Sequence, residues 1–426
     1  ALQKRTYDLV VVDEAHSLKN HQTSTYKFVY SLNRKHTILM SATPIQNDLR
    51  ELFNLVNILK PGMLQSRRKF RREFMEERFK PKNIEKLKQL LKEVMIRHRR
   101  TDTLVELPRR KVMNDVIEIN GLERDFYNGV VDFCRDIYRN QVKSRMSVGT
   151  EESRVELIVL LLMSLLKQNS SSPQSTLKTL ETKVLTKLEK EEEIEACEKL
   201  IKIGKKIKVP TKAKTLIDKI KDSDEQCIVY SEYIPTLSML KKAFEKEGID
   251  VILYHGGMNP KEKAEAVIQF KEGKGRVFLS TESGGQGLNL QFCHILYNYD
   301  LPWNPMKIEQ RIGRVHRFGQ KNDVEIYMMP IKGTIDEYLL YILTSKVNLF
   351  EMVIGELDTI MSYMLQDDVS LEVKIGEIIL TSKSSKEIEE KMRQISQEVI
   401  KAKEEYDSDV IGSSVVLDEI GVSEHE

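Results

Sequence analysis

The sequence predicts an α/β protein with parallel sheets, and three observations support this fold class. Short runs of β-branched and aliphatic residues lack the polar alternation of half-exposed strands, which is typical of strands buried on both faces. Stretches with a helical spacing of apolar residues separate most of these runs. The length of 426 residues allows about three domains at roughly 150 residues each, so more than one core can form.

The first segment carries two such strands. Tyr7–Val12 is predicted to be a strand buried on both faces, and Thr37–Met40 is predicted to be its neighbour. Apolar residues at helical spacing between positions 26 and 32 predict a helix between them. Strand, crossover and strand together favour a parallel pair.

The middle segment, Pro61–Lys208, is predicted to be mainly helical. Charged and apolar residues alternate at helical spacing there, and Val112–Ile119 is the one predicted strand. Ser170–Pro173 predicts a loop. The basic stretch Arg67–Arg72 favours either a phosphate-contacting patch or a solvated helix face.

From Thr211 the sequence predicts a second doubly wound domain of about 135 residues. Beyond Ser345 the pattern is mixed, with a charged helical stretch at Lys383–Glu405 and an acidic end. The predicted strands of the second domain are Cys227–Tyr230, Val251–Tyr254, Arg276–Ser280, His294–Asn298 and Val324–Met329.

Composition excludes several classes of protein. The 67 basic and 65 acidic residues give a net charge of +2, so any nucleic-acid surface must be local. The four cysteines stand at least 30 residues apart, which excludes the usual zinc-ligand spacings and a disulfide scaffold and favours a reducing compartment. No apolar run approaches the roughly 20 residues of a membrane helix, so no membrane partner is expected.

An acidic pair follows the first predicted strand. Ligands of open α/β sheets bind at the carboxyl ends of strands. Asp13 there could hold Mg²⁺ directly or through water, and Glu14 could orient and deprotonate an attacking water. An acidic turn that caps the next helix is the alternative interpretation.

Three further stretches could act with this pair. Ser41 and Thr43 follow the second strand, where their hydroxyls could bond the acids, unless this is an ordinary turn. Gly284, Gly285 and Gly287 follow another strand, where glycines allow close backbone approach to a phosphate.

Arg314 and Arg317 are the third stretch. On a helix they would share a face, and two guanidinium groups suit a triphosphate. A basic surface helix is the alternative.

In this order, the motifs resemble the Swi/Snf-type ATPases of helicase superfamily 2. The resemblance covers about residues 1–345. The stretches that carry it are Asp13–His16, Ser41–Asn47, Glu51–Phe53, Ser280–Leu290, Asp300–Pro305 and Arg314–Gln320, with Arg99–Thr101 and Leu107–Pro108 similar to the family's link between lobes.

The resemblance implies an architecture of two RecA-like helicase lobes with helical insertions, the first lobe partial and the second complete. Residues 1–60 would be the carboxyl-side part of lobe 1, 61–105 the first helical protrusion, and 106–120 the interlobe link. Residues 121–208 would be the second protrusion, 209–345 lobe 2 (the helicase C-terminal domain), and 346–426 a C-terminal extension.

The resemblance also implies ATP-driven translocation along double-stranded DNA, with ATP and Mg²⁺ as cofactors. By residue, it implies that Arg314 and Arg317 are arginine fingers and that Gln310 contacts nucleotide or couples the lobes. The remaining implied roles are nucleotide contact for Gly287, coupling for His16, Ser41 and Thr43, and nucleic-acid contact for Thr281, Gly284, Gly285, Asn289 and Trp303.

The family's P-loop, G-x-x-x-x-G-K-[ST], does not occur in the 426 residues. We therefore expect a carboxyl-side fragment that is inactive alone, with the P-loop segment of the same protein as its partner. The first lobe would then also lack several of its strands. Their absence would leave an open apolar edge of the sheet and make residues 1–60 poorly stable alone.

Several alternatives stay open at this level. Leu165–Pro173 resembles bacterial and archaeal members, some of which (the RapA-like ones) act with RNA polymerase, so RNA polymerase or another recruited protein is a further expected partner. A cytoplasmic, nucleoid-associated prokaryotic protein is expected. The alternative functions are an RNA helicase or polymerase-recycling ATPase, and a non-catalytic DNA-binding chain.

Overall fold

The structure is a computed structural model. It describes residues 2–41, 49–75, 82–96, 108–146, 152–281, 288–302, 305–345, 371–382, 384, 386–395, 397–398 and 401. The described residues up to 96 form one compact unit and those from 108 to 395 form a second. The parallel α/β class predicted from the sequence is confirmed in both units.

The first unit is built on two parallel strands, β1 (Thr6–Val12) and β2 (Asn33–Leu39), with Val10 opposite Thr37. The crossover between the strands holds a 3₁₀ turn, Ala15–Leu18, and the helix α1 (Ser24–Tyr30), which Thr23 caps. The next helices are α2 (Leu49–Leu59), α3 (Arg67–Phe74) and α4 (Ile84–Lys92).

Helix α2 has two apolar sides, which places it between two clusters. Leu55 and Ile58 pack with residues of the crossover beside the sheet. Leu52 packs with Phe70 and other residues of α3 and α4. Each such side chain contributes about 1.5–3 kcal/mol on full burial. Helix α3 is thus anchored in the core by its aromatic residues, and its basic residues flank them.

The prediction that the first strand is buried on both faces is wrong for the described residues. Leu9 and Val11 of β1 are 50% and 51% exposed, and Ile38 of β2 is 47% exposed. The physical reason is that the described apolar residues packed against this sheet lie on one side of it, where Val12 and Leu39 are partly buried.

The second unit contains a six-stranded, all-parallel sheet in the order β3-β8-β7-β4-β6-β5. Its strands are β3 (Arg110–Asn114), β4 (Cys227–Tyr230), β5 (Val251–Tyr254), β6 (Val277–Ser280), β7 (Ile295–Asn298) and β8 (Val324–Met328). Every residue of three of the four inner strands, β4, β6 and β7, is buried, as expected for strands covered on both faces.

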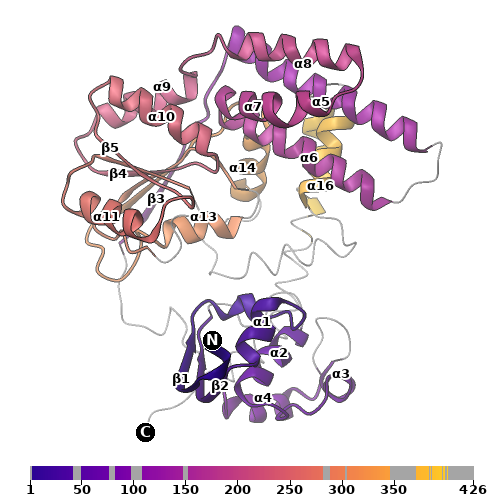
Figure 1. Cartoon of the computed structure of the whole chain (residues 1–426), viewed down its shortest axis with the longest axis vertical. Helices are drawn as coiled ribbons and strands as arrows, with labels where there is room; N and C mark the ends of the chain where they lie inside the picture. Colours follow the sequence, from indigo (N-terminus) through magenta and orange to yellow (C-terminus); the bar gives the residue numbers. More distant parts are fainter. Residues whose placement is uncertain are drawn as a thin grey trace. The chain divides into compact units, whose positions relative to one another are not determined.

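Helices cover both faces of this sheet. Figure 1 shows α9 (Thr211–Lys221) and α10 (Ile234–Lys246) on one face, and α11 (Pro260–Lys271) and α13 (Pro305–Ile312) on the other. Helix α14 (Ile335–Ser345) follows β8. The four cysteines are buried and free.

The predicted helical middle segment is confirmed within the described residues. It contains α5 (Leu122–Met146), α6 (Glu152–Ser171), α7 (Pro173–Thr179) and α8 (Glu191–Gly204), with a short π-helix (Leu180–Val184) and a 3₁₀ turn (Leu185–Lys187) between the last two. Helix α16 (Leu371–Thr381) packs against α5 and α6 (Figure 1).

Residues 106–120, which were expected to form the interlobe link, contain β3 as an edge strand of the second sheet, and β3 overlaps the strand predicted at Val112–Ile119. One sequence expectation changes in this region. Ser170–Pro173 was expected to be a loop. Instead Ser171 ends α6, and the buried Ser172 caps α7, its hydroxyl accepting a hydrogen bond from the Ser175 amide at 3.1 Å. The serines satisfy backbone groups at a buried helix junction, which is why a polar run stands there.

Candidate functional site

The acidic pair of the first unit lies at the carboxyl end of β1, and both side chains are exposed. The strand pairing continues past the regular strands, because the Met40 amide donates to the Val12 carbonyl and the Ala15 amide donates to the Met40 carbonyl, both at 2.8 Å. Ala15 is fully buried, so the backbone beside the pair is anchored in the core.

Glu14 has a positive φ of 51°, a conformation uncommon for a non-glycine residue. Its amide donates to Asp13 Oδ1 at 2.8 Å, and its carbonyl accepts from the Ser17 amide at 3.1 Å. Such strain is found more often at functional sites than elsewhere. Ser41 directly follows Met40 and is half-buried, so it lies at the adjacent strand end. Thr43 and the side chain of His16 lie outside the described residues.

The arginines of the second unit do not lie on a helix, so the expectation of a shared helical face is wrong. Helix α13 ends at Ile312, and the segment from Gly313 to Gln320 is a series of turns. The Arg314 carbonyl accepts from the Leu290 amide at 3.0 Å, a bond to a segment outside these turns. Arg314 is half-buried and Arg317 is exposed. We call residues 313–320 the arginine loop.

Gln320 ties the arginine loop to the residues that directly follow the stretch Ser280–Leu290. The side-chain nitrogen of Gln320, Nε2, donates to the backbone carbonyls of Gln291 at 2.9 Å, Cys293 at 3.0 Å and Val315 at 3.2 Å. Its side-chain oxygen accepts from the amides of residues 321 and 322. Gly319 has a φ of +95°, which favours glycine where the loop turns beside Gln291. Two predicted motifs are thus brought together in one unit.

The other predicted residues of the second unit are placed as follows. Thr281 is 5% exposed at the end of β6, and its amide donates to the Tyr254 carbonyl. Asn289 is exposed, as is Gln310 on α13. Gly284, Gly285, Gly287 and Trp303 lie outside the described residues.

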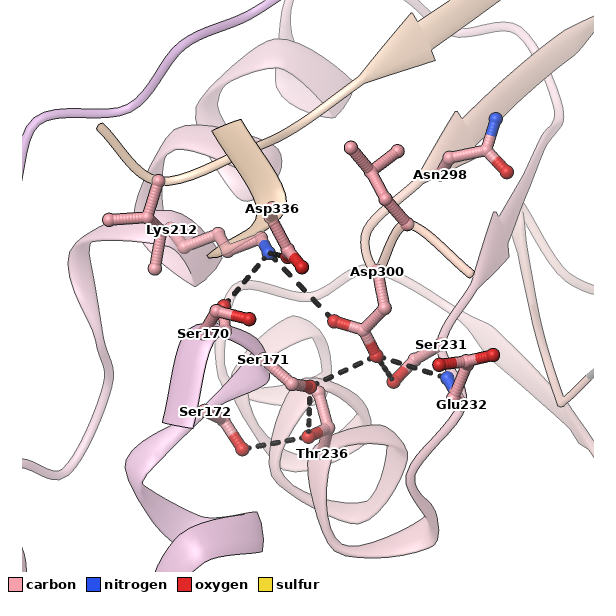
Figure 2. Close-up of polar contacts among 12 residues, drawn as sticks. Ser170, Ser171, Ser172, Lys212, Ser231, Glu232, Thr236, Asn298, Asp300 and Asp336 are labelled. Atoms are coloured by element: carbon pink, nitrogen blue, oxygen red, sulfur yellow. Dashed lines mark hydrogen bonds and ion pairs between the residues drawn. The ribbon is translucent and has the colours of Figure 1, made fainter. Parts of the chain in front are cut away.

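A buried polar cluster, which sequence reasoning did not single out, lies at the carboxyl ends of β4 and β7 (Figure 2). Asp300 is its centre. One oxygen, Oδ2, accepts from the Ser171 hydroxyl at 3.0 Å, the Ser231 hydroxyl at 2.5 Å and the Glu232 amide at 3.0 Å. The Asp300 carbonyl accepts from Arg311 of α13 at 2.9 Å. Asp300 thereby connects the helical segment, the sheet and the helix that precedes the arginine loop.

Lys212 provides the positive charge of this cluster. Its Nζ lies 3.8 Å from Asp300 Oδ1 and 3.7 Å from Asp336 Oδ2, and it donates to the Ser170 carbonyl at 3.1 Å (Figure 2). All three charged side chains are 1–2% exposed. Burial raises the pKa of Asp336 even though Lys212 acts to lower it.

For Glu232, at the edge of the same cluster, the nearby positive charges outweigh the effect of burial on the pKa. Burial acts to raise its pKa, but Lys167, Arg311 and Lys307 together hold the pKa below the ordinary value for a glutamate. Lys167 Nζ lies 3.3 Å from Glu232 Oε2. The carboxylate is therefore kept ionised beside the strand ends.

Sequence reasoning could not find these partners because they are far apart in the chain. Asp300 and Ser171 are separated by 129 positions, and Asp300 and Lys212 by 88. Two local signals were present, the polar run that ends at Ser172 and the stretch Asp300–Pro305, but neither indicated that the two lie side by side. In the described part of the chain, no group of acidic, histidine and cysteine side chains is arranged to hold a metal ion on its own.

The fold and these strand-end residues place the chain in the class of parallel α/β proteins whose ligand sites lie at the carboxyl ends of strands. Residues 1–183 match the SNF2-related domain family, and residues 211–319 match the helicase conserved C-terminal domain family. The chain belongs to the SNF2-related, helicase-like family.

The chain is similar to several known members of this family. It is 37% identical over 389 residues to the uncharacterized ATP-dependent helicase YqhH of Bacillus subtilis, over 91% of this chain and 66% of that protein. It is 29% identical to a RAD54-like DNA repair and recombination protein of Gallus gallus, over 89% of this chain and 52% of that protein. The chain thus spans only part of the length of these relatives.

Among solved structures, the chain resembles the Sulfolobus solfataricus SWI2/SNF2 ATPase core in complex with double-stranded DNA. The TM-score is 0.39 and the sequence identity is 23%, over 87% of this chain and 74% of that one.

Proposed function

We propose that the protein to which this chain belongs is an ATPase stimulated by double-stranded DNA, and that it translocates along the duplex. The observation that carries the proposal is the match of the chain to both the SNF2-related and the helicase C-terminal families, in that order. The relatives include DNA repair and recombination proteins, which favours DNA as the nucleic-acid partner.

Asp13 and Glu14 fit the acidic half of a Mg²⁺–ATP site. Both are exposed carboxylates at a parallel strand end, and carboxylate oxygens are ligands that Mg²⁺ prefers. In the proposed mechanism Asp13 would hold the ion, which would supply positive charge against the phosphates, and Glu14 would orient a water molecule and accept a proton from it. Arg314 and Arg317 stabilise charge on the phosphoryl group.

The proposed nucleic-acid contacts are Thr281, Gly284, Gly285, Asn289 and Trp303, and Gln310 would contact nucleotide or couple the lobes. Because the 426 residues contain no G-x-x-x-x-G-K-[ST] sequence, we propose that turnover also needs a phosphate-binding segment beyond these residues. A cytoplasmic, nucleoid-associated location and recruitment by RNA polymerase or another protein are part of the proposal. Cell fractionation and co-purification test these two points.

Glu14→Gln in the intact protein is expected to abolish ATP turnover while ATP binding is retained, because the amide cannot accept the proton. Arg317→Ala is expected to lower kcat about 10³-fold or more, on the scale of arginine fingers. Turnover is measured with and without double-stranded DNA, and ATP binding by equilibrium dialysis. Asp8→Asn is the matched control, because Asp8 is an exposed carboxylate of the same strand, paired with Lys35 at 2.6 Å.

Three outcomes contradict parts of the proposal. Unchanged turnover of Glu14→Gln rejects the role of Glu14. A loss confined to DNA affinity in Arg317→Ala makes Arg317 a phosphate anchor. Stimulation of ATP turnover by single-stranded RNA in place of DNA favours an RNA helicase. DNA binding by the intact protein without ATP turnover favours a non-catalytic DNA-binding chain.

A further inference from the structure

The edge strand β3 is joined to helix α13 by a buried charge pair. Arg110 NH1 donates to both carboxylate oxygens of Glu309, at 3.1 and 3.0 Å. The side chains are 14% and 5% exposed. Removing one partner of so well buried a pair leaves the other charge without compensation, so the pair strongly favours the arrangement in which both are present.

The same guanidinium also holds the arginine loop. Arg110 Nε donates to His316 Nδ1 at 3.0 Å, and His316 Nε2 lies 2.8 Å from the Pro108 carbonyl. Because an arginine Nε only donates, Nδ1 must be the acceptor, and Nε2 therefore carries the proton that it donates to Pro108. His316 is 6% exposed and stands between Arg314 and Arg317 in the loop.

The strand that carries Arg110 is itself fixed. It pairs in parallel with β8 along its whole length, and the Val324 amide donates to the Arg109 carbonyl at 2.9 Å. The Arg109 amide donates to Asp323 Oδ1 at 3.1 Å. The arginine loop is thus held on one side by Leu290, Gln291 and Cys293, the last two through Gln320 of the loop, and on the other by the chain segment at 108–110, which enters the second unit.

We propose that Arg110 is a positioning residue for Arg314 and Arg317, and that it couples the entering segment to the arginine loop. Arg110 acts through Glu309 and His316 and does not itself contact nucleotide. Any displacement of the segment at 108–110 then moves the arginine loop with it. The part of the proposal that concerns catalysis rests on the proposed ATPase function, whereas the coupling of strand and loop does not.

The test compares three variants in the intact protein and in residues 1–426. Arg110→Met removes every donor at similar length. Arg110→Lys keeps the charge but lacks the planar fork, so it can reach Glu309 or His316 but not both. Lys111→Met is the matched control, because Lys111 is the next residue on β3 and its ion pair with Asp323 is 55% and 39% exposed.

Arg110→Met is expected to lower kcat for ATP at least tenfold while KM changes less than twofold, and Arg110→Lys is expected to restore part of kcat. In residues 1–426, amide hydrogen exchange of the arginine loop is expected to quicken at least tenfold in Arg110→Met, with β4 and β6 unchanged. Lys111→Met is expected to leave both readouts within twofold of wild type.

Unchanged loop exchange and unchanged kcat in Arg110→Met overturn the proposal. If exchange rises throughout the second unit, Arg110→Met has lost the fold, and the loop exchange of Arg110→Lys decides the question. If the wild-type intact protein hydrolyses no ATP with any nucleic acid, the proposed function fails, but the exchange measurement still accepts or rejects the coupling.

Discussion

Lys212→Met is expected to destabilise the second unit by about 3–5 kcal/mol at pH 7. The ammonium lies 3.8 and 3.7 Å from two carboxylates, and all three groups are almost fully buried. At an effective dielectric constant of about 20, each pair is worth about 4 kcal/mol, or about 8 kcal/mol in total. Desolvation of the ammonium offsets several kcal/mol of this, which leaves a loss in the range measured for broken buried pairs.

Further contacts of Lys212 are lost in the same variant. Its Nζ lies 4.6 Å from the centre of the Tyr299 ring, and it donates to the Ser170 carbonyl. Methionine is similar in length, so little cavity is expected and the change reports mainly on charge. The assay is urea unfolding of residues 1–426, followed by circular dichroism at 222 nm, with the free energy of unfolding extrapolated to water.

The loss is expected to shrink as the pH falls. The folded-state pKa of Asp336 is already raised by burial, so its contribution to stability falls as pH rises from the unfolded pKa through the folded pKa. Without Lys212, ionisation of Asp336 becomes still less favourable, and the difference between variant and wild type is largest above that pKa. Protonation at acid pH removes the uncompensated charge and narrows the difference.

Lys205→Met is the control for this prediction. Lys205 pairs with Glu181 at 2.7 Å, but the side chains are 61% and 38% exposed, so a loss below about 1 kcal/mol is expected. A loss below about 1 kcal/mol in Lys212→Met, or a loss that does not narrow toward pH 4, refutes the argument that Lys212 balances the two buried carboxylates.

Two further predictions concern packing. Gly204→Ala is expected to destabilise the second unit by about 1–3 kcal/mol, because the new Cβ would lie 2.7 Å from Phe126 and crowd the helical segment; urea unfolding at the wild-type level would show that the ring can move aside. Leu52→Ala is expected to cost the first unit about 2–5 kcal/mol, against less than about 1 kcal/mol for the half-exposed Leu9→Ala, and equal losses in thermal unfolding would contradict the assigned core.

Much of the fold follows from local sequence patterns. The inner strands β4, β6 and β7 are short apolar runs, and burial on both faces requires that composition wherever they stand in the sheet. The acidic pair after β1 could be located in the same way, because a strand followed by two carboxylates needs no distant partner to be recognised. The order and identity of these motifs also sufficed to indicate the family.

The exposure of β1 could not be predicted, because it depends on what packs against the strand. Leu9 and Val11 have the composition of a fully buried strand, yet they are half-exposed among the described residues. An apolar composition shows that both faces of a strand can be buried. Whether they are buried depends on which other elements pack against the strand. The shared helical face expected for Arg314 and Arg317 was wrong for a similar reason, since the bond from Leu290 to Arg314 joins segments 24 positions apart.

By itself, the sequence determined the parallel α/β class, the positions of most strands and the motifs that identify the family, since these depend on side-chain periodicity and local composition. Tertiary structure alone decided that Asp300 gathers Ser171, Ser231 and Arg311, and that Arg110 holds Glu309 and His316. Those contacts join positions up to 206 residues apart. Buried charges and hydrogen-bonding groups pair with groups that lie near them in space. The order of the parallel strands decides which groups are near one another, and local sequence patterns do not reveal that order.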